Sequence, residues 1–227
     1  MTDLTYETSA VVVVDMQYGD AHRAWGLLKD KRAAGLVEEV ERYACRLDDL
    51  VVPNIQRLLA AFRSNGGEVI YVRIESLTED GRDRGREHRA RGIHFAPGSQ
   101  EGKILDEIAP VGDELVLSKT CGSAFRGTNI EYLLRNMQRS AVFVVGVVTG
   151  SCVQATALDA AARGISTTAI EDATATWNAE MQRAALEAMR SGGVEVLSTE
   201  GVLETLARAG RSGGPQVKRT LTLPNPV

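Results

Sequence analysis

Short, continuous apolar runs recur along the chain and predict buried β-strands. The first run, Ala-Val-Val-Val-Val at 10–14, ends at Asp15. A run that does not alternate and is rich in β-branched residues is typical of a strand buried on both faces of a parallel sheet. Similar runs follow at 68–73, 114–117, 141–146, 166–170 and 194–197. We therefore expect six strands.

Segments with apolar residues at helical spacing lie between these runs. Residues 50–64 have this spacing and end before Asn65-Gly66-Gly67, a typical helix stop. Thr128-Asn129-Ile130-Glu131 has the pattern of a capping box. Further helices are predicted at 153–163, 179–190 and 200–209, the last stopping at Gly210. The alternation predicts an α/β fold, a Rossmann-like three-layer α/β/α sandwich with a mostly parallel six-stranded sheet.

Two segments depart from this alternation. Residues 75–103 contain five arginines and little periodicity, and a loop of that length in a compact domain is usually functional or disordered. Residues 211–227 are rich in Gly, Pro, Ser and Thr. We expect one domain over 1–210, and a C-terminal tail over 211–227 that packs loosely or reaches a neighbouring subunit.

The composition narrows the class of protein. The chain has 227 residues, of which 44% are hydrophobic and 25% are charged, an ordinary globular composition. Its net charge of −4 gives no support for nucleic-acid binding. No apolar run approaches the roughly 18 residues that span a bilayer, and the first eight residues are too polar for a secretory signal. We expect a soluble, cytoplasmic protein that binds neither membrane nor nucleic acid.

The cysteines and histidines indicate neither disulfides nor a metal. Three widely spaced cysteines are a poor disulfide framework, and they form no Cys-x-x-Cys pair. The three histidines form no His-x-His or His-Glu-x-x-His pattern. We therefore expect no metal and no cofactor.

Three reactive side chains follow predicted strands. Asp15 follows the first strand, Lys119 the third and Cys152 the fourth. Ligands of open parallel sheets bind outside the carboxyl ends of the strands, so the three should converge. Cys152 begins a predicted helix, whose dipole and free N–H groups would lower the thiol pKa and hold an oxyanion. Asp15 would accept the thiol proton.

Each residue alone has an ordinary explanation. A free cysteine is usually an inert core residue, an aspartate after a strand is commonly a turn residue, and a lone lysine is usually at the surface. Cys121, two residues after Lys119, has no pattern of a nucleophile. Only the convergence of Asp15, Lys119 and Cys152 favours a site of nucleophilic catalysis.

These residues lie in segments that resemble the isochorismatase-like cysteine hydrolases, a superfamily that includes nicotinamidase, N-carbamoylsarcosine amidohydrolase and biuret hydrolase. The resemblance extends from about residue 9 to residue 197, and it rests on three main motifs. These are Val-Val-Val-Val-Asp-Met-Gln at 11–17, Lys119 with Ser-Ala-Phe-x-Gly-Thr at 123–128, and Gly-Val-Val-Thr-Gly-Ser-Cys-Val at 146–153.

The resemblance implies roles for particular residues. Asp15, Lys119 and Cys152 match the catalytic triad of the superfamily. The Val148–Thr149 bond matches its non-proline cis peptide, and Val148, Thr149 and Cys152 match its oxyanion hole. The implied reaction forms a thioester at Cys152 with loss of ammonia or an amine, and water then hydrolyses the thioester.

The resemblance also points to a substrate class. Residues 80–99 and 128–136 are similar to the biuret, triuret and ureidoacrylate hydrolase branch, whereas Gly150-Ser151 is closer to the N-carbamoylsarcosine and maleamate amidohydrolases. A nicotinamidase is disfavoured, because its Asp-x-His metal site has no counterpart after Tyr71. We expect an amidohydrolase that cleaves a small linear amide or ureide and releases ammonia.

Candidate substrate-binding residues are Gln17, Phe125 and Arg126, together with the arginines of 75–103. An arginine could hold a substrate carboxylate or urea oxygen through its planar fork, although a solvated charged loop is the simpler interpretation of most of them. Two other functions stay open: a hydrolase that cleaves a vinyl ether on the same fold, and a non-catalytic binding protein. Related proteins are typically oligomeric, so a homodimer or homotetramer is expected.

Overall fold

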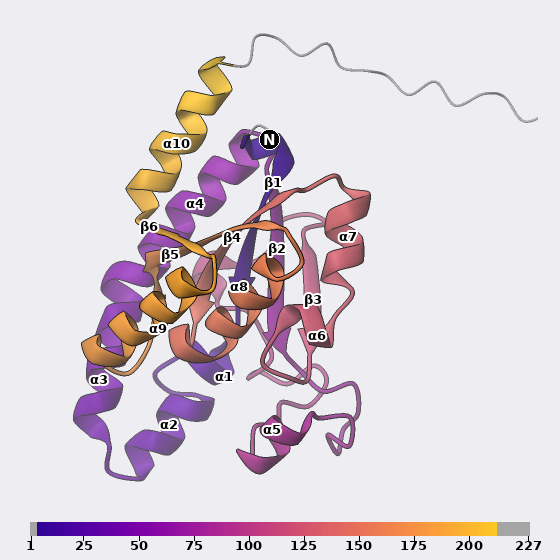
Figure 1. Ribbon diagram of the computed structural model, residues 1–227. Helices are drawn as coiled ribbons and strands as arrows, with labels where there is room; N and C mark the ends of the chain where they lie inside the picture. The colour runs from indigo at the N-terminus through magenta and orange to yellow at the C-terminus, as the bar shows by residue number, and fades with distance from the viewer. Residues whose placement is uncertain (1–3, 213–227) are drawn as a thin grey trace, which may run out of the picture.

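A computed structural model describes residues 4–212 of the chain (Figure 1). Six parallel strands form one sheet in the order β3-β2-β1-β4-β5-β6. The strands are β1 (Ser9–Val14), β2 (Glu68–Ile74), β3 (Leu115–Lys119), β4 (Ala141–Val147), β5 (Ser166–Ala175) and β6 (Glu195–Leu197). The predicted parallel sheet is confirmed. Strand β5 continues to Ala175 instead of ending at residue 170, beyond a register shift against β4 between Val144 and Gly146.

The central strand β1 is buried along its whole length. It pairs with β2 on one side and β4 on the other, so Val11 lies between Val69 and Phe143. Alternate side chains enter two separate cores, with Val11 and Val13 in one and Val12 in the other. Each fully buried valine contributes about 1.5–3 kcal/mol. A run with no polar position therefore suits a strand that is covered on both faces.

Helices cover both faces of the sheet, as expected for three layers (Figure 1). One face carries α3 (Val37–Arg46), α4 (Val52–Ser64) and α10 (Thr199–Ser212). The other carries α6 (Ala124–Gly127), α7 (Ile130–Asn136), α8 (Gln154–Ala161) and α9 (Ala179–Ser191). Among the helices of 4–212, none is both long and apolar enough to cross a membrane.

Several helix ends differ from the prediction. The capping box before α7 does not form: Thr128 Oγ1 accepts from the Ile130 amide, while Glu131 pairs with Arg135 and Arg163 instead. Helix α10 runs to Ser212 and not to residue 209. It therefore enters the predicted tail, whose remaining residues, 213–227, lie outside the described part of the chain.

The segment between β1 and α4 and the insertion at 75–103 pack together at the carboxyl end of the sheet. They contribute the short helices α1 (Tyr18–Ala21), α2 (Gly26–Ala33) and α5 (Arg86–Ala90), none of which was predicted (Figure 1). Phe95 of the insertion lies against Gly19 of α1 so closely that a Cβ at Gly19 would overlap its ring. The insertion is therefore an ordered part of the fold.

Candidate active site

Asp15, Lys119 and Cys152 meet at the carboxyl edge of the sheet. Asp15 follows β1, Lys119 ends β3, and Cys152 follows β4. Lys119 Nζ donates to Asp15 Oδ2 at 2.9 Å and lies 3.3 Å from Cys152 Sγ. The sequence predicted that all three lie at this edge. In the structure Lys119 contacts both Asp15 and Cys152.

Burial controls the charges of this triad. The exposed fractions of Asp15, Lys119 and Cys152 are 1%, 0% and 7%. Burial raises the pKa of the Asp15 carboxyl group, against the opposing effects of Lys119 and Cys152. It also raises the pKa of the Cys152 thiol, and the Asp15 carboxylate adds to that increase. Both acidic groups therefore hold their protons more tightly than they would in water.

Lys119 stays charged in this setting. Burial alone would lower the pKa of its ammonium group, but the attraction of Asp15 and Cys152 is larger in sum, so its pKa lies above the ordinary value. The ammonium group can thus stabilise whichever partner holds the negative charge, the carboxylate or the thiolate. The second Asp15 oxygen, Oδ1, is buried and makes no hydrogen bond of ordinary geometry, which leaves it available to accept a proton.

The backbone that carries the triad is unusual at two positions. Asp15 has a φ of 52°, in the left-handed region that non-glycine residues rarely adopt. Gly146 has a φ of 111°, and a Cβ there would overlap the Val14 carbonyl group. Such conformations cluster at functional sites, where the surrounding structure maintains them.

The structure corrects three predictions around Cys152. Helix α8 begins at Gln154, and Cys152 lies in a preceding π-helical turn, Thr149–Val153. Its thiol pKa is raised rather than lowered, because burial and the Asp15 carboxylate outweigh the Lys119 charge. The non-proline cis peptide joins Val147 to Val148, one bond before the expected Val148–Thr149 bond.

The oxyanion hole of Val148, Thr149 and Cys152 stays a prediction, but its loop is firmly held. The Val148 carbonyl group accepts from the Ser151 amide at 2.9 Å. Thr149 is fully buried, and its hydroxyl group donates to Gln182 of α9 at 2.8 Å. No sequence pattern singled out Gln182. Its contact links α9 to the loop that carries the thiol.

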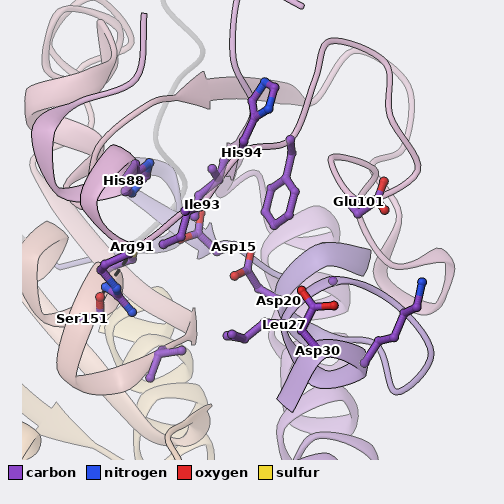
Figure 2. Close-up of a pocket in the computed structure, with 17 residues that line it drawn as sticks. Asp15, Asp20, Leu27, Asp30, His88, Arg91, Ile93, His94, Glu101 and Ser151 are labelled. Carbon is purple, nitrogen blue, oxygen red and sulfur yellow. Dashed lines mark hydrogen bonds between the residues drawn. The ribbon is translucent and has the colours of Figure 1, made fainter. Parts of the chain in front are cut away.

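A cavity of about 310 Å³ opens onto Asp15 and Cys152 (Figure 2). That volume suits a small molecule of the size expected from the sequence. One side is formed by the loop of Val148, Ser151 and Cys152, and another by Leu27, Lys29 and Asp30 of α2. The insertion supplies the remaining wall with His88, Arg91, Gly92, Ile93, His94, Phe95 and Glu101.

None of the three named substrate-binding candidates lines this cavity. Gln17 is fully buried, and its amide bonds the backbone of Ile74 and Glu101. Phe125 is a core residue that stacks beneath Arg163. Arg126 forms a bidentate pair with Asp159 at 2.7 and 2.8 Å, outside the cavity. Gln17 is therefore a positioning residue, and Phe125 and Arg126 belong to the α6–α8 packing.

Arg91, one of the insertion arginines, lines the cavity, and a role in holding the substrate stays a prediction. The sequence did not indicate Asp20 or His88, which are both buried and both line the cavity. Burial, with the Lys119 charge, lowers the pKa of His88 to about 4, so its imidazole is neutral at pH 7. Asp20 follows the first motif by three residues, and its proximity to that motif was the available signal.

The insertion wall is fastened to the sheet at both ends. Glu75 accepts from the Ser118 hydroxyl group at 2.8 Å and the Gly98 amide at 3.1 Å. The Gln17 amide joins the end of β2 to the Glu101 carbonyl group at 3.0 Å. Further along, the Tyr18 amide donates to the Lys103 carbonyl group at 2.9 Å. These bonds fix the wall relative to the triad.

Comparison with known proteins agrees with this geometry. Residues 9–201 match the isochorismatase domain family. Over 127 residues the chain is 32% identical to an N-carbamoylsarcosine amidase of an Arthrobacter species, a match that covers 54% of this chain and about half (48%) of that relative.

Two solved structures extend the likeness to nearly the whole fold. A cysteine hydrolase from Pseudomonas syringae pv. phaseolicola 1448A has a TM-score of 0.78 and 26% identity, covering 92% of this chain and 97% of that one. An N-carbamoylsarcosine amidase from Thermoplasma acidophilum has a TM-score of 0.65 and 27% identity, covering 85% and 97%. The protein belongs to the isochorismatase-like hydrolase family, and its buried cysteine lies where the parallel strands end.

Proposed function

We propose that the protein is a cysteine-dependent amidohydrolase acting on a small linear amide or ureide. The contact that carries this proposal is Lys119 Nζ between Asp15 Oδ2 and Cys152 Sγ, at 2.9 and 3.3 Å. An internal proton transfer from the thiol to Asp15 yields a thiolate beside the ammonium group, with no change in the net charge of the triad. A buried nucleophile is activated in this way without proton exchange with solvent.

The reaction then follows from the positions of these groups. The thiolate sulfur bonds to the substrate carbonyl carbon, and the carbonyl electron pair moves onto oxygen near the backbone of Thr149 and Cys152. Collapse of this adduct breaks the C–N bond, and Asp15 returns the proton to the departing nitrogen. The product is a thioester at Cys152 and ammonia or an amine.

Hydrolysis of the thioester completes the cycle. Asp15 takes a proton from a water molecule, whose oxygen bonds to the thioester carbon. The C–S bond breaks, and the thiolate recovers the proton from Asp15. The Asp15 Oδ1 atom is buried and makes no hydrogen bond of ordinary geometry, so it suits both proton transfers. The cavity of about 310 Å³ admits a substrate of this kind but not a long chain.

A second candidate is hydrolysis of a vinyl ether. The observation that favours it is the raised pKa of Asp15, due to burial, since a buried protonated carboxyl group is a proton donor. That chemistry needs no thiol. The contact of Cys152 with Lys119 has no part in it, so we favour the amidohydrolase.

Ammonia release by the purified protein tests the proposal. The panel holds biuret, a ureidoacrylate, N-carbamoylsarcosine, maleamate and nicotinamide. Release from one of them should fall by at least about a thousandfold in Cys152→Ala. Cys121→Ala is the matched control, because the Cys121 thiol donates to the Ser123 carbonyl group and does not line the cavity. Equal ammonia release by Cys152→Ala and the unaltered protein, or vinyl-ether hydrolysis that survives Cys152→Ala, would overturn the assignment.

A further inference from the structure

The cavity holds a second buried carboxyl group that the proposed reaction does not use. Asp20 of α1 is 7% exposed and lines the cavity together with Asp15 (Figure 2). Its Oδ2 atom is buried and has no hydrogen-bond partner. The Asp20 backbone is held in place, since its amide donates to Gln17 at 3.1 Å and its carbonyl group accepts from the Tyr43 hydroxyl group at 3.4 Å.

No cation neutralises Asp20 within residues 4–212. Lys119 is paired with Asp15, and Arg91 at the cavity rim is paired with Glu87 at 3.1 Å. Burial raises the pKa of Asp20 to about 8, and repulsion by Asp15 adds to the increase, against smaller opposing effects of Lys119 and Arg91. The other titratable groups around it in the cavity wall and on α3 are Lys29, Asp30, Tyr43, His88, His94 and Glu101. At pH 7 the group is mostly a neutral acid.

A neutral carboxyl group presents one donor and one acceptor side by side. An amide or ureido group presents the complementary pair, a carbonyl oxygen and an N–H. A carboxylate presents acceptors alone. Because an unpaired buried polar group costs about 1–3 kcal/mol, a ligand that satisfies both Asp20 oxygens gains affinity by relieving that cost.

We propose that Asp20 recognises a second amide or ureido group of the substrate through a cyclic pair of hydrogen bonds. The cavity then selects ureides and diamides over amides that carry a carboxylate at the same position. This specificity role rests on the proposed amidohydrolase function. A purely structural Asp20 would affect all substrates alike.

Two variants separate these roles. The amide side chain introduced by Asp20→Asn keeps a donor and an acceptor and does not titrate, whereas Asp20→Leu removes both. Biuret and N-carbamoylsarcosine are the substrates, because the first offers a second amide group and the second a carboxylate. In Asp20→Leu the kcat/KM ratio of biuret to N-carbamoylsarcosine should fall by about tenfold to a hundredfold, as two hydrogen bonds are lost. In Asp20→Asn the kcat/KM ratio should still favour biuret over N-carbamoylsarcosine.

The pH profile gives the second readout. Above about pH 8 the ionised Asp20 loses its donor, so the KM for biuret should rise by about tenfold from about pH 7 to about pH 9 in the unaltered protein. In Asp20→Asn this rise should be absent. If Asp20→Leu does not fold, the pH dependence of the biuret KM in Asp20→Asn is enough to test the proposal.

Two results with the variants would overturn this specificity role. One is an unchanged biuret ratio in folded Asp20→Leu, and the other is the same alkaline rise of KM in Asp20→Asn. A protein that hydrolyses N-carbamoylsarcosine in preference to biuret would also overturn it, yet would leave the amidohydrolase standing. Whether the protein is an amidohydrolase at all is tested separately, by ammonia release from Cys152→Ala.

Discussion

Lys119 Nζ lies 2.9 Å from Asp15 Oδ2, and both side chains are almost completely enclosed by protein. The pair joins the ends of β1 and β3, which are not neighbours in the sheet, since β2 separates them. The two charges therefore depend on each other, because each is the charged partner of the other in a buried setting.

Removal of the lysine should destabilise the fold strongly. In Lys119→Met the Asp15 carboxyl group is left buried without its cation, and the free energy of unfolding should fall by about 3–5 kcal/mol. Asp15→Asn combined with Lys119→Met should recover part of that loss, because no charge is left buried. Urea denaturation measures both. The control is Arg82→Ala, which breaks the exposed pair with Asp80 and should leave the stability almost unchanged. Equal losses of unfolding free energy in Lys119→Met and Arg82→Ala would contradict the mutual dependence of the Lys119 and Asp15 charges.

Gly146 should tolerate no side chain. Gly146→Ala must place a Cβ against the Val14 carbonyl group, in addition to the strain of its φ of 111°. The free energy of unfolding should fall by more than about 3 kcal/mol. Gly164 is the matched control, since it has a φ of 75° and open space around its Cα. Gly164→Ala should cost only about 1 kcal/mol. Similar losses for the two variants would show that φ alone, and not the overlap with β1, sets the requirement.

His88 should make the fold sensitive to mild acid. Burial, with the Lys119 charge, lowers its pKa from 6.5 to about 4 in the folded protein. Between these values the unfolded chain binds the extra proton, so stability falls as the pH falls. From about pH 7 to about pH 5 the loss should be on the order of 1 kcal/mol, allowing for solvent screening. Urea midpoints at both pH values measure it.

His88→Leu should flatten this acid loss. His22→Leu is the control, because it removes a partly exposed histidine from the end of α1. If the stability of His88→Leu still falls between about pH 7 and about pH 5, the acid sensitivity belongs to another group.

The sheet and the triad were predictable for a simple physical reason. Strands of a doubly covered parallel sheet need apolar residues on both faces, and Val11 and Val12 indeed enter opposite cores. Their carboxyl ends share one edge, so the residues that follow, such as Asp15, must lie near one another. The whole triad follows from that rule together with the six strand positions.

The cavity wall was not predictable in the same way. Residues 75–103 have no period, and their fold depends on distant partners such as Gln17 and Ser118. Arg126 resembled a substrate-binding residue until its partner Asp159, on another helix, was known. The sequence also did not predict that the pKa of the Cys152 thiol is raised, because burial and the Asp15 charge act on it more strongly than the Lys119 charge.

The two ends of the insertion have a consequence for how such a protein diversifies. The segment leaves the sheet after Ile74 and returns beside Gln17 at Ile104. The Gln17 side chain bonds the backbone of both Ile74 and Glu101, so it links the start of the segment to its end. A segment that is held at both ends is a place where residues can change with little effect on the strands. Part of the cavity wall can therefore change in evolution while Asp15, Lys119 and Cys152 stay in place.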